Sequence, residues 1–280
     1  CDQFVVDDAF CVHGLNYSQH EGLCEISRQL GHNPLRSMET FPTRLSVNGN
    51  KIATLRNARG GQLPCPVAAA ERIQQWGADG ITVHPRPDAR HITFDDVRRL
   101  KKVTTQEFNI EGYPSDDFID LVLEVTPDQV TLVPDPPGIL TSNAGWDTRT
   151  HAAFLTEVLL RFRNAGIRTS LFIDTETDLI QGAADVGADR IELYTGPYAE
   201  GFRLDPSGAI RPFVQAAAFA ENAGLGVNAG HDLDLDNLAH FARHVQSLYE
   251  VSIGYALISD ALYVGLQNAV GQYKAQLRPA

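Results

Sequence analysis

The sequence predicts an α/β protein built as one barrel of eight parallel β-strands that alternate with helices. Three observations favour this fold. Short apolar segments of strand length recur from Arg44 onward, helix-like segments separate them, and a turn of small residues that includes glycine precedes several of the strands. A glycine near the end of a helix, followed by a buried strand, is the junction expected between a helix and the next parallel strand. Eight such units over about 240 residues fit the usual size of this barrel.

The strands are expected at eight places in chain order: Leu45–Asn48, Ile81–Val83, Phe108–Glu111, Gln129–Val133, Thr169–Ile173, Ile191–Tyr194, Leu225–Asn228 and Val251–Gly254. The helices are expected at Val67–Trp76, Phe94–Lys102, Ser115–Val125, Thr148–Asn164, Thr177–Val186, Ile210–Asn222, Leu235–Ser247 and Ser259–Leu277. Regular alternation favours parallel strands with crossover helices. An open doubly wound sheet is the alternative, but no GxGxxG follows the first strand and no Walker-type loop occurs. We therefore predict a (β/α)8, or TIM, barrel.

The barrel is expected to occupy residues 38–280 as a single catalytic domain. Residues 1–37 show no sustained helical or strand period, and Met38 is the only methionine in the chain. We interpret Met38 as the natural start, which would make residues 1–37 a non-native leader. The alternative is a genuine N-terminal extension.

Composition restricts the possible partners. A formal net charge of -12 argues against a general nucleic-acid or membrane-surface binder, because such partners select basic surfaces. No apolar run approaches the roughly 18 residues of a membrane span, and no signal-peptide pattern is seen, so a cytoplasmic protein is expected. The four cysteines form no CxxC pair, and we expect neither a disulfide framework nor a metal site.

Polar residues end several of the predicted strands, where the chemistry of such a barrel is located. His84, Glu111 and His231 each lie at or near the end of an apolar run, where a polar group without a partner or a task costs free energy. Each one alone could fill a satisfied structural role, but together they form a set suited to acid/base catalysis. Asp135 and Asp174 are interpreted instead as a turn residue and a helix cap.

Cationic loops beside these residues indicate anion binding. The stretch Thr82–His91 carries two histidines and two arginines, and its prolines favour a stiff, extended loop. The segment Asn50–Gly61 carries three cations and a glycine pair, although on spacing alone it could be a solvated basic turn or helix. Glycines after Val227 and at Gly254 lie at the corner where barrels commonly bind phosphate. Two anion sites suggest one bisphosphate or two phosphorylated substrates.

Several of these segments together resemble the pyridoxine 5'-phosphate synthase family, over about Arg44 to Leu277. The segments that carry the resemblance are Lys51–Gly60, Gly77–His84, Arg90–Ile92, Asn109–Glu111, Leu132–Pro134 and Val227–His231. The resemblance implies a barrel enzyme of vitamin B6 biosynthesis, without cofactor or metal. It implies condensation of 1-deoxy-D-xylulose 5-phosphate with 3-amino-2-oxopropyl phosphate to give pyridoxine 5'-phosphate, phosphate and water. It also implies a homo-oligomer.

The resemblance assigns a role to each matching position. It implies that His84, Glu111 and His231 are catalytic. The residues implied to bind deoxyxylulose phosphate are Asn50, Lys51, Arg86, His91 and Thr141, and those implied to bind aminooxopropyl phosphate are Asn48, Arg59, Asp232, Gly254 and Tyr255. Arg90 is expected to face solvent.

Three positions depart from the pattern common in the family. The pair Asn50-Lys51 stands where Asp-His is usual, Asp232 where glycine is usual and Tyr255 where histidine is usual. Lys51 keeps a cation, whereas Tyr255 keeps only a hydrogen-bond donor that does not titrate near neutral pH. Asp232 brings a carboxylate close to an expected phosphate, where only its backbone amide could help.

Two other functions stay open at this point. A phosphosugar isomerase or epimerase barrel would also use Glu and His near a phosphate, and it would turn over a single substrate. A non-catalytic protein that binds a B6 phosphate would show product affinity without synthesis.

Overall fold

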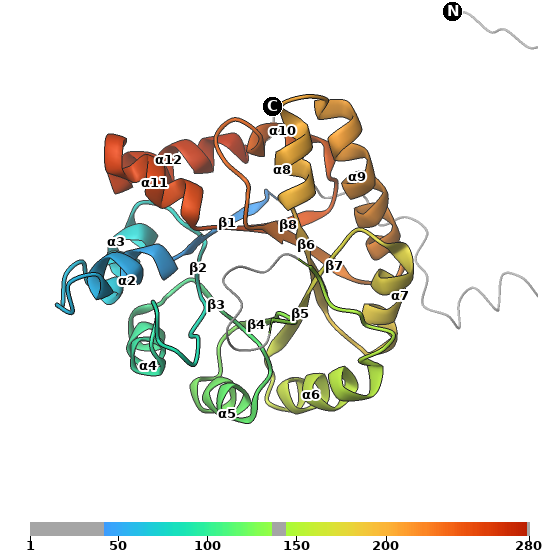
Figure 1. The fold of residues 1–280 in the computed structure, drawn as a ribbon, viewed down its shortest axis with the longest axis horizontal. Helices are drawn as coiled ribbons and strands as arrows, with labels where there is room; N and C mark the ends of the chain where they lie inside the picture. The colour runs from blue at the N-terminus through green and yellow to red at the C-terminus, as the bar shows by residue number, and fades with distance from the viewer. Residues whose placement is uncertain (1–41, 136–143, 279–280) are drawn as a thin grey trace, which may run out of the picture. The chain divides into compact units, whose positions relative to one another are not determined.

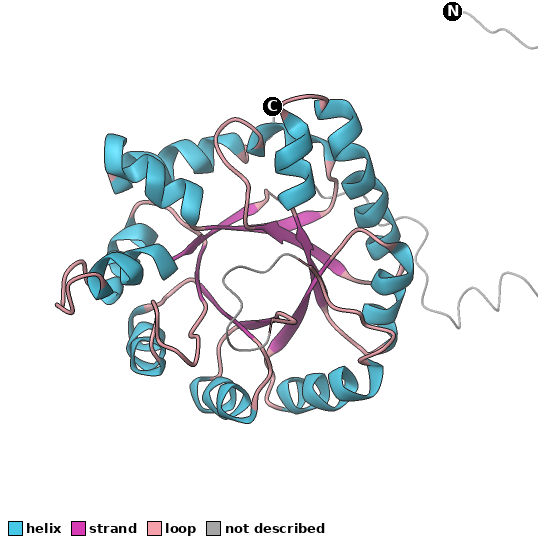
Figure 2. Cartoon of the chain, in the orientation of Figure 1, coloured by secondary structure: helices cyan, strands magenta, loops and turns pink. Residues whose placement is uncertain are grey.

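A closed barrel of eight parallel strands forms the centre of the chain, which confirms the predicted fold. The computed structural model describes residues 42–135 and 144–278, so the predictions for residues 1–37 and for Thr141 lie outside the described residues. Each strand pairs with the next in sequence, and β8 returns to pair with β1. Figures 1 and 2 show the strands as a ring with the helices packed around its outer side.

All eight predicted strands are present. They are β1 (Arg44–Asn48), β2 (Gly80–Val83), β3 (Glu107–Gly112), β4 (Gln129–Leu132), β5 (Arg168–Ile173), β6 (Arg190–Tyr194), β7 (Gly226–Gly230) and β8 (Leu248–Ile253). The helices are α2 (Asn50–Asn57), α3 (Pro66–Gln75), α4 (Phe94–Val103), α5 (Asp116–Val125), α6 (Ala152–Asn164), α7 (Thr177–Asp185), α8 (Gly196–Phe202), α9 (Pro206–Asn222), α10 (Leu238–His244), α11 (Tyr255–Val264) and α12 (Leu266–Gln276).

Five features of the helices differ from the predictions. The cationic segment after β1 is the helix α2 followed by a turn, and α8 directly after β6 was not expected. The C-terminal segment was predicted as one helix, but it forms α11 and α12 because Gly265 between them has a φ of +82°, which ends α11. Helix α6 begins at Ala152 rather than Thr148, because the hydroxyl of Thr148 bonds to the carbonyl of Leu179 in a turn. Helix α10 is shorter than predicted.

The apolar core lies between the strands and the helices, as a layer around the barrel. Outward side chains of the strands, such as Val47 and Ile110, are fully buried against apolar helix faces. Helix α4 shows how the sequence builds this layer. A capping box between Thr93 and Asp96 fixes its first turn, and Val97 then lies on its buried face.

The interior of the barrel, by contrast, is largely polar. Ser46 and Thr82 share a hydrogen bond of 2.7 Å, and the Thr131 hydroxyl donates to Asn109 at 3.2 Å. At the amino ends of the strands the carboxylate of Glu107 pairs with Arg44 at 2.9 Å. Buried polar groups are costly unless they are hydrogen-bonded, so these networks are what makes a polar interior stable. The polar interior leads directly to the candidate site at the carboxyl ends of the strands.

No helix in the described ranges is long and apolar enough to cross a membrane.

Candidate active site

A cavity of about 340 Å³ opens at the carboxyl ends of the strands. It gathers eleven of the thirteen residues named from the sequence: Asn48, Asn50, Lys51, His84, Arg86, His91, Glu111, His231, Asp232, Gly254 and Tyr255. These residues come from β1, β2, β3, β7, β8 and the segments that follow them, and closure of the barrel brings them to one place. The cavity combines carboxylates, imidazoles and cations, the groups needed for proton transfer beside bound anions.

Glu111, near the end of β3, is held by hydrogen bonds on both carboxyl oxygens. Asn48 donates its side-chain amide to Oε2 at 3.2 Å, and the Ser252 hydroxyl donates to Oε1 at 3.4 Å. Burial raises the pKa of Glu111 to about 7, while the neighbouring His231 and these two hydrogen bonds partly offset the effect of burial. A carboxyl group that titrates near neutrality can accept and return a proton within one catalytic cycle.

His231 follows β7 in a strained conformation, with a φ of +88°. Its Nδ1 lies 3.1 Å from Oδ2 of Asp232, and its ring meets those of Phe172 and Tyr194 edge-on, with centroids 6.3 and 5.9 Å away. Burial lowers the pKa of His231, but the hydrogen bond to Asp232 and the charges of Asp232, Glu111 and Asp135 outweigh burial and raise this pKa above its ordinary value. The protonated imidazole is therefore favoured beside Glu111.

His84 and His91 behave in the opposite way. Burial and the adjacent charge of Arg86 lower the pKa of His84 well below its ordinary value. Burial, Arg86 and Lys51 lower the pKa of His91 to about 4. Both imidazoles are thus neutral near pH 7, and Nδ1 of His91 is buried without a hydrogen-bond partner among the described residues. An unpaired buried nitrogen beside two cations is suited to an anionic ligand.

Helix α2 supports this cationic side of the cavity through Arg56. The guanidinium of Arg56 binds the carboxylate of Asp96 through two hydrogen bonds of 2.6 and 2.8 Å, and it donates a third, at 3.1 Å, to the carbonyl of His91. Asn57 donates to the same carbonyl at 2.9 Å. Because Asp96 also caps α4, this buried ion pair connects α2, α4 and the loop that carries His91.

Arg59 is the one described site candidate that the structure does not bring to the cavity. It lies just beyond α2 and is exposed, whereas Arg56, three residues earlier, is buried on the inner face of that helix. Thr141, as noted, lies outside the described residues.

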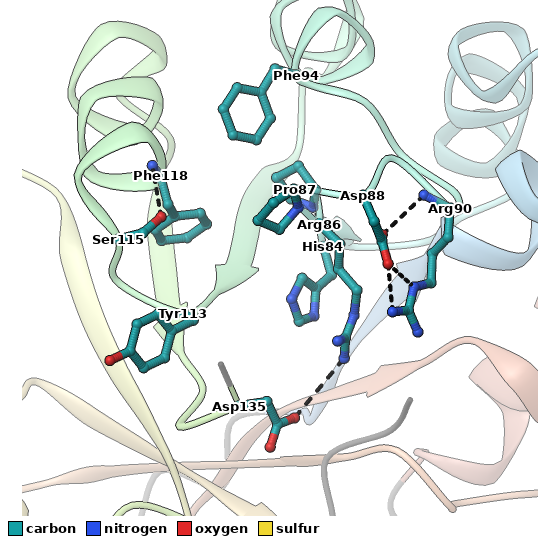
Figure 3. A pocket seen from close by; sticks show the side chains of 11 residues that line it. His84, Arg86, Pro87, Asp88, Arg90, Phe94, Tyr113, Ser115, Phe118 and Asp135 are labelled. Atoms are coloured by element: carbon teal, nitrogen blue, oxygen red, sulfur yellow. Dashed lines mark hydrogen bonds and ion pairs between the residues drawn. The ribbon is translucent and has the colours of Figure 1, made fainter. Parts of the chain in front are cut away.

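The interpretation of Asp174 as a helix cap was wrong, and Asp135 makes a contact beyond the turn expected of it. Asp174 accepts a hydrogen bond from the amide of Gly145 at 2.8 Å, whereas Glu176 occupies the N-cap position of α7. Asp135 lies 4.0 Å from the guanidinium of Arg86, which itself lines the cavity (Figure 3). Arg90, expected to face solvent, is partly exposed and paired with Asp88 at 2.5 Å.

Sequence comparison places the chain among enzymes of known name. The family model described as "Pyridoxal phosphate biosynthesis protein PdxJ" matches residues 45–279. The chain belongs to the PdxJ family.

Curated members of the PdxJ family match at high identity over nearly their whole length. A protein from Bacteroides fragilis (strain YCH46), named pyridoxine 5'-phosphate synthase, is 58% identical over 236 residues, which cover 84% of this chain and 100% of the relative. A protein of the same name from Cytophaga hutchinsonii is 56% identical and covers 84% of this chain and 99% of its own length. The family resemblance stated from the motifs is thereby confirmed.

Solved structures with low sequence identity share the barrel. Tryptophan synthase subunit alpha from Legionella pneumophila aligns with a TM-score of 0.57 at 14% identity, covering 92% of this chain and 97% of that one. 3-Keto-L-gulonate-6-phosphate decarboxylase from Vibrio cholerae aligns with a TM-score of 0.58 at 11% identity, covering 85% of this chain and 100% of that one. These similarities support the fold only.

Within this PdxJ-family chain, the three unusual positions all line the cavity. Nζ of Lys51 lies 5.5 Å from the ring centroid of Tyr255, in a cation–π arrangement at the cavity mouth. Asp232 directs its carboxylate to His231. Gly254 packs against Asn48 so closely that a Cβ at this position would lie 2.9 Å from the Cβ of Asn48.

Four cavity-lining residues were not predicted from the sequence: Val133, Phe172, Glu192 and Ser252. Glu192 is the most informative, because it is 4% exposed in the middle of β6. Burial and the nearby charges of Glu111 and Glu250 raise its pKa well above the ordinary value, so its protonated form is favoured. Its position inside the apolar run Ile191–Leu193 was a usable signal, because a charged residue in a buried strand needs a partner or a function.

Among the described residues, no group of three or more His, Cys, Asp or Glu side chains is arranged to hold a metal ion.

Proposed function

We propose that this protein is a transferase-class pyridoxine 5'-phosphate synthase. It would condense 1-deoxy-D-xylulose 5-phosphate with 3-amino-2-oxopropyl phosphate to give pyridoxine 5'-phosphate, phosphate and water. One observation carries the proposal. Glu111, with a pKa of about 7, lies in a cavity that also holds an imidazole whose raised pKa favours its protonated form. Membership of the PdxJ family supports the same reaction.

The proposed roles follow from the protonation states. Glu111 is the main base that removes protons beside a carbonyl, because its pKa allows the carboxylate to form near neutral pH. His231 donates protons to leaving oxygens, because its charged form is favoured by Asp232. His84 starts the cycle neutral and shuttles protons at the other side. One substrate supplies the amine of the Schiff base, so no lysine nucleophile is required.

The cationic side of the cavity is proposed to bind deoxyxylulose phosphate. Arg86, His91, Asn50 and Lys51 line this side, and the unpaired Nδ1 of His91 supports their role. Thr141 is retained as a contact from the family resemblance.

The opposite corner is proposed to bind aminooxopropyl phosphate. Gly254 lies at the N-cap of α11, where helix amides favour an anion, and Asn48, Asp232 and Tyr255 line the same cavity. The family resemblance adds Arg59, whose exposed position would require it to move or to serve another subunit.

The proposal also covers the domain organisation, the location in the cell and the oligomeric state of the protein. The barrel from Met38 onward acts as the catalytic domain, the protein works in the cytoplasm without a bound cofactor, and it forms a homo-oligomer. Leu262 and Tyr263 of α11 are 73% and 90% exposed and offer an apolar surface for contact between subunits. Light scattering on purified protein would measure the oligomeric state.

The decisive experiment is incubation with both substrates, with pyridoxine 5'-phosphate and released phosphate measured together. Glu111→Gln serves as the control, because it keeps the size of the side chain and removes the base. Synthesis by the wild type and its loss in the variant are expected. Turnover of one substrate alone would instead favour an isomerase or epimerase. Affinity for the product without synthesis would favour a non-catalytic binding protein.

A further inference from the structure

A second, smaller cavity lies behind Arg86, on the side facing β3 and β4. It has a volume of about 40 Å³, and Arg86 and His84 line both this cavity and the main one. Its walls include the aromatic rings of Phe94 and Tyr113, and Asp135 closes its lower edge (Figure 3). Arg86 therefore forms part of the partition between the proposed active site and a smaller cavity lined by both aromatic and charged side chains.

Asp135 faces this partition from the end of β4. Its side chain is 8% exposed, that of Arg86 is 9% exposed, and Oδ2 of Asp135 lies 4.0 Å from a terminal nitrogen of Arg86. Opposite charges at this separation interact more strongly when they are partly removed from water. A residue that served only to make a turn would not need to bury its carboxylate beside a guanidinium of the site.

We propose that Asp135 is a positioning residue that holds the guanidinium of Arg86 and balances its charge against the acid/base pair Glu111 and His231. This inference rests on the proposed function and deepens it. The negative charges of Asp135, Asp88 and Glu111 all act on the guanidinium of Arg86, and Asp135 is the one that forms an ion pair with it, at 4.0 Å. In the substrate-free site, the negative charge of Asp135 offsets the positive charge of Arg86. Arg86 therefore lowers the pKa of Glu111 less than it would without Asp135.

The charged residues around Arg86, Glu111 and His231 decide whether the pKa values of Glu111 and His231 rise or fall when Asp135 is changed. They come from the loop after β2, from β3, from β6 and from the segments after β4 and β7: Asp88, Arg90, Glu111, Asp135, Glu192 and Asp232. Glu111 and Asp135 are the acids whose charges act on both Arg86 and His231, and of these two Asp135 is the one outside the proposed acid/base pair. Without the negative charge of Asp135, the protonated imidazole of His231 loses stabilisation, and the positive charge of Arg86 acts more strongly on the carboxylate of Glu111.

Asp135→Asn should therefore lower the pKa of both members of the acid/base pair. The expected decrease is on the order of half a pH unit for each, because a single charge is removed at short range in a partly desolvated site. Both limbs of the pH profile of kcat/KM should move to lower pH together. A purely structural role would lower activity at every pH and leave the two limbs in place.

The closing experiment measures His231 directly in the substrate-free protein, by NMR titration of its Cε1 proton, with the resonance assigned by its absence from His231→Asn. Asp135→Asn should lower this pKa, and Asp135→Glu, which keeps the charge, should leave it near the wild-type value. Asp88→Asn is the matched control, because it removes the same charge from the exposed side of the Arg86 loop, where Asp88 is 47% exposed. Asp135→Ser replaces Asp135→Asn if the latter does not fold.

An unchanged His231 pKa in the charge-removing variant, or an equal decrease in Asp88→Asn, would overturn the inference. The titration requires no turnover. If the wild type fails to synthesise pyridoxine 5'-phosphate while the His231 pKa responds as expected, the proposed reaction fails and the electrostatic role of Asp135 stands. If the wild type synthesises pyridoxine 5'-phosphate and the His231 pKa does not respond to Asp135→Asn, the proposed reaction stands and the electrostatic role of Asp135 fails.

Discussion

Replacing Glu111 with glutamine is expected to stabilise the fold at alkaline pH while it abolishes synthesis. The pKa of Glu111 is about 7 in the folded protein, against an ordinary value of 4.5. Because folding raises this pKa, the folded state favours the protonated carboxyl group. The free energy of unfolding should therefore fall as pH rises from 4.5 through 7 and then stay lowered.

The size of the effect follows from the two pKa values, which differ by about 2.5. A pKa difference of one unit corresponds to about 1.36 kcal/mol, so ionised Glu111 lowers the free energy of unfolding by about 3 kcal/mol at most. The carboxyl group of Glu111 is partly exposed at the cavity, so solvent screens its charge, and the loss of about 3 kcal/mol is an upper limit. Glutamine keeps the size of the side chain and an oxygen that can accept from Asn48, so the variant removes the charge with little loss of contact.

Urea unfolding of wild type and Glu111→Gln at two pH values tests this reasoning. At pH 8.5 the variant should be more stable by up to about 3 kcal/mol, and at pH 5 the difference should fall to about 1 kcal/mol or less. Glu157→Gln, on the exposed side of α6, is the control and should change neither value. The reasoning is refuted if Glu111→Gln is no more stable than wild type at pH 8.5, or if its advantage is the same at both pH values.

Three further predictions address the scaffold and the chemistry. Arg56→Met should lower the free energy of unfolding by about 3–5 kcal/mol because it leaves the carboxylate of Asp96 buried without its ion-pair partner; in urea unfolding, the double variant with Asp96→Asn should lose less than the sum of the single variants, and additive losses would argue against a coupled pair. Gly254→Ala should displace Asn48 from Glu111 and reduce kcat by roughly tenfold or more, since a Cβ would lie 2.9 Å from the Cβ of Asn48; a normal kcat would show that this contact can relax. Synthesis should persist in excess EDTA because the proposed acid/base groups are all side chains of the chain, and activity lost to EDTA and restored by a metal ion would contradict this.

The barrel could be predicted because its strands are apolar runs separated by regular helix-like segments. That His84, Glu111 and His231 would lie together could be predicted for a related reason: they end or follow such runs, and closure of the barrel brings these ends into one cavity. The pKa values that distinguish their roles could not be read from the sequence, because they depend on burial and on charges contributed by other strands.

The first helix shows where prediction from sequence failed. Lys51, Arg56 and Arg59 looked alike as cations of one loop, but the helical arrangement of α2 buries Arg56 against Asp96 and leaves Arg59 exposed. The face of α2 on which each arginine lies separates the structural Arg56 from Arg59, a candidate for substrate binding, and the sequence alone did not give that face. Glu192 was missed for a different reason: the apolar residues on both sides of it were interpreted only as a strand, although a charged residue inside such a run is itself a signal.

The polar interior of the barrel has a consequence for how this enzyme could evolve. The apolar layer that stabilises the fold lies outside the strands, whereas the residues that face the reaction lie inside them. Substitutions in the interior can therefore change polarity and charge without opening holes in the apolar core, and some, such as Glu111→Gln, should even stabilise the protein. Such a separation lets new substrate specificities be sampled without disturbing the apolar core, provided that each buried polar group keeps a hydrogen-bond partner. Directed evolution of this barrel should accordingly accept more variants at inward-facing strand positions than at outward-facing ones.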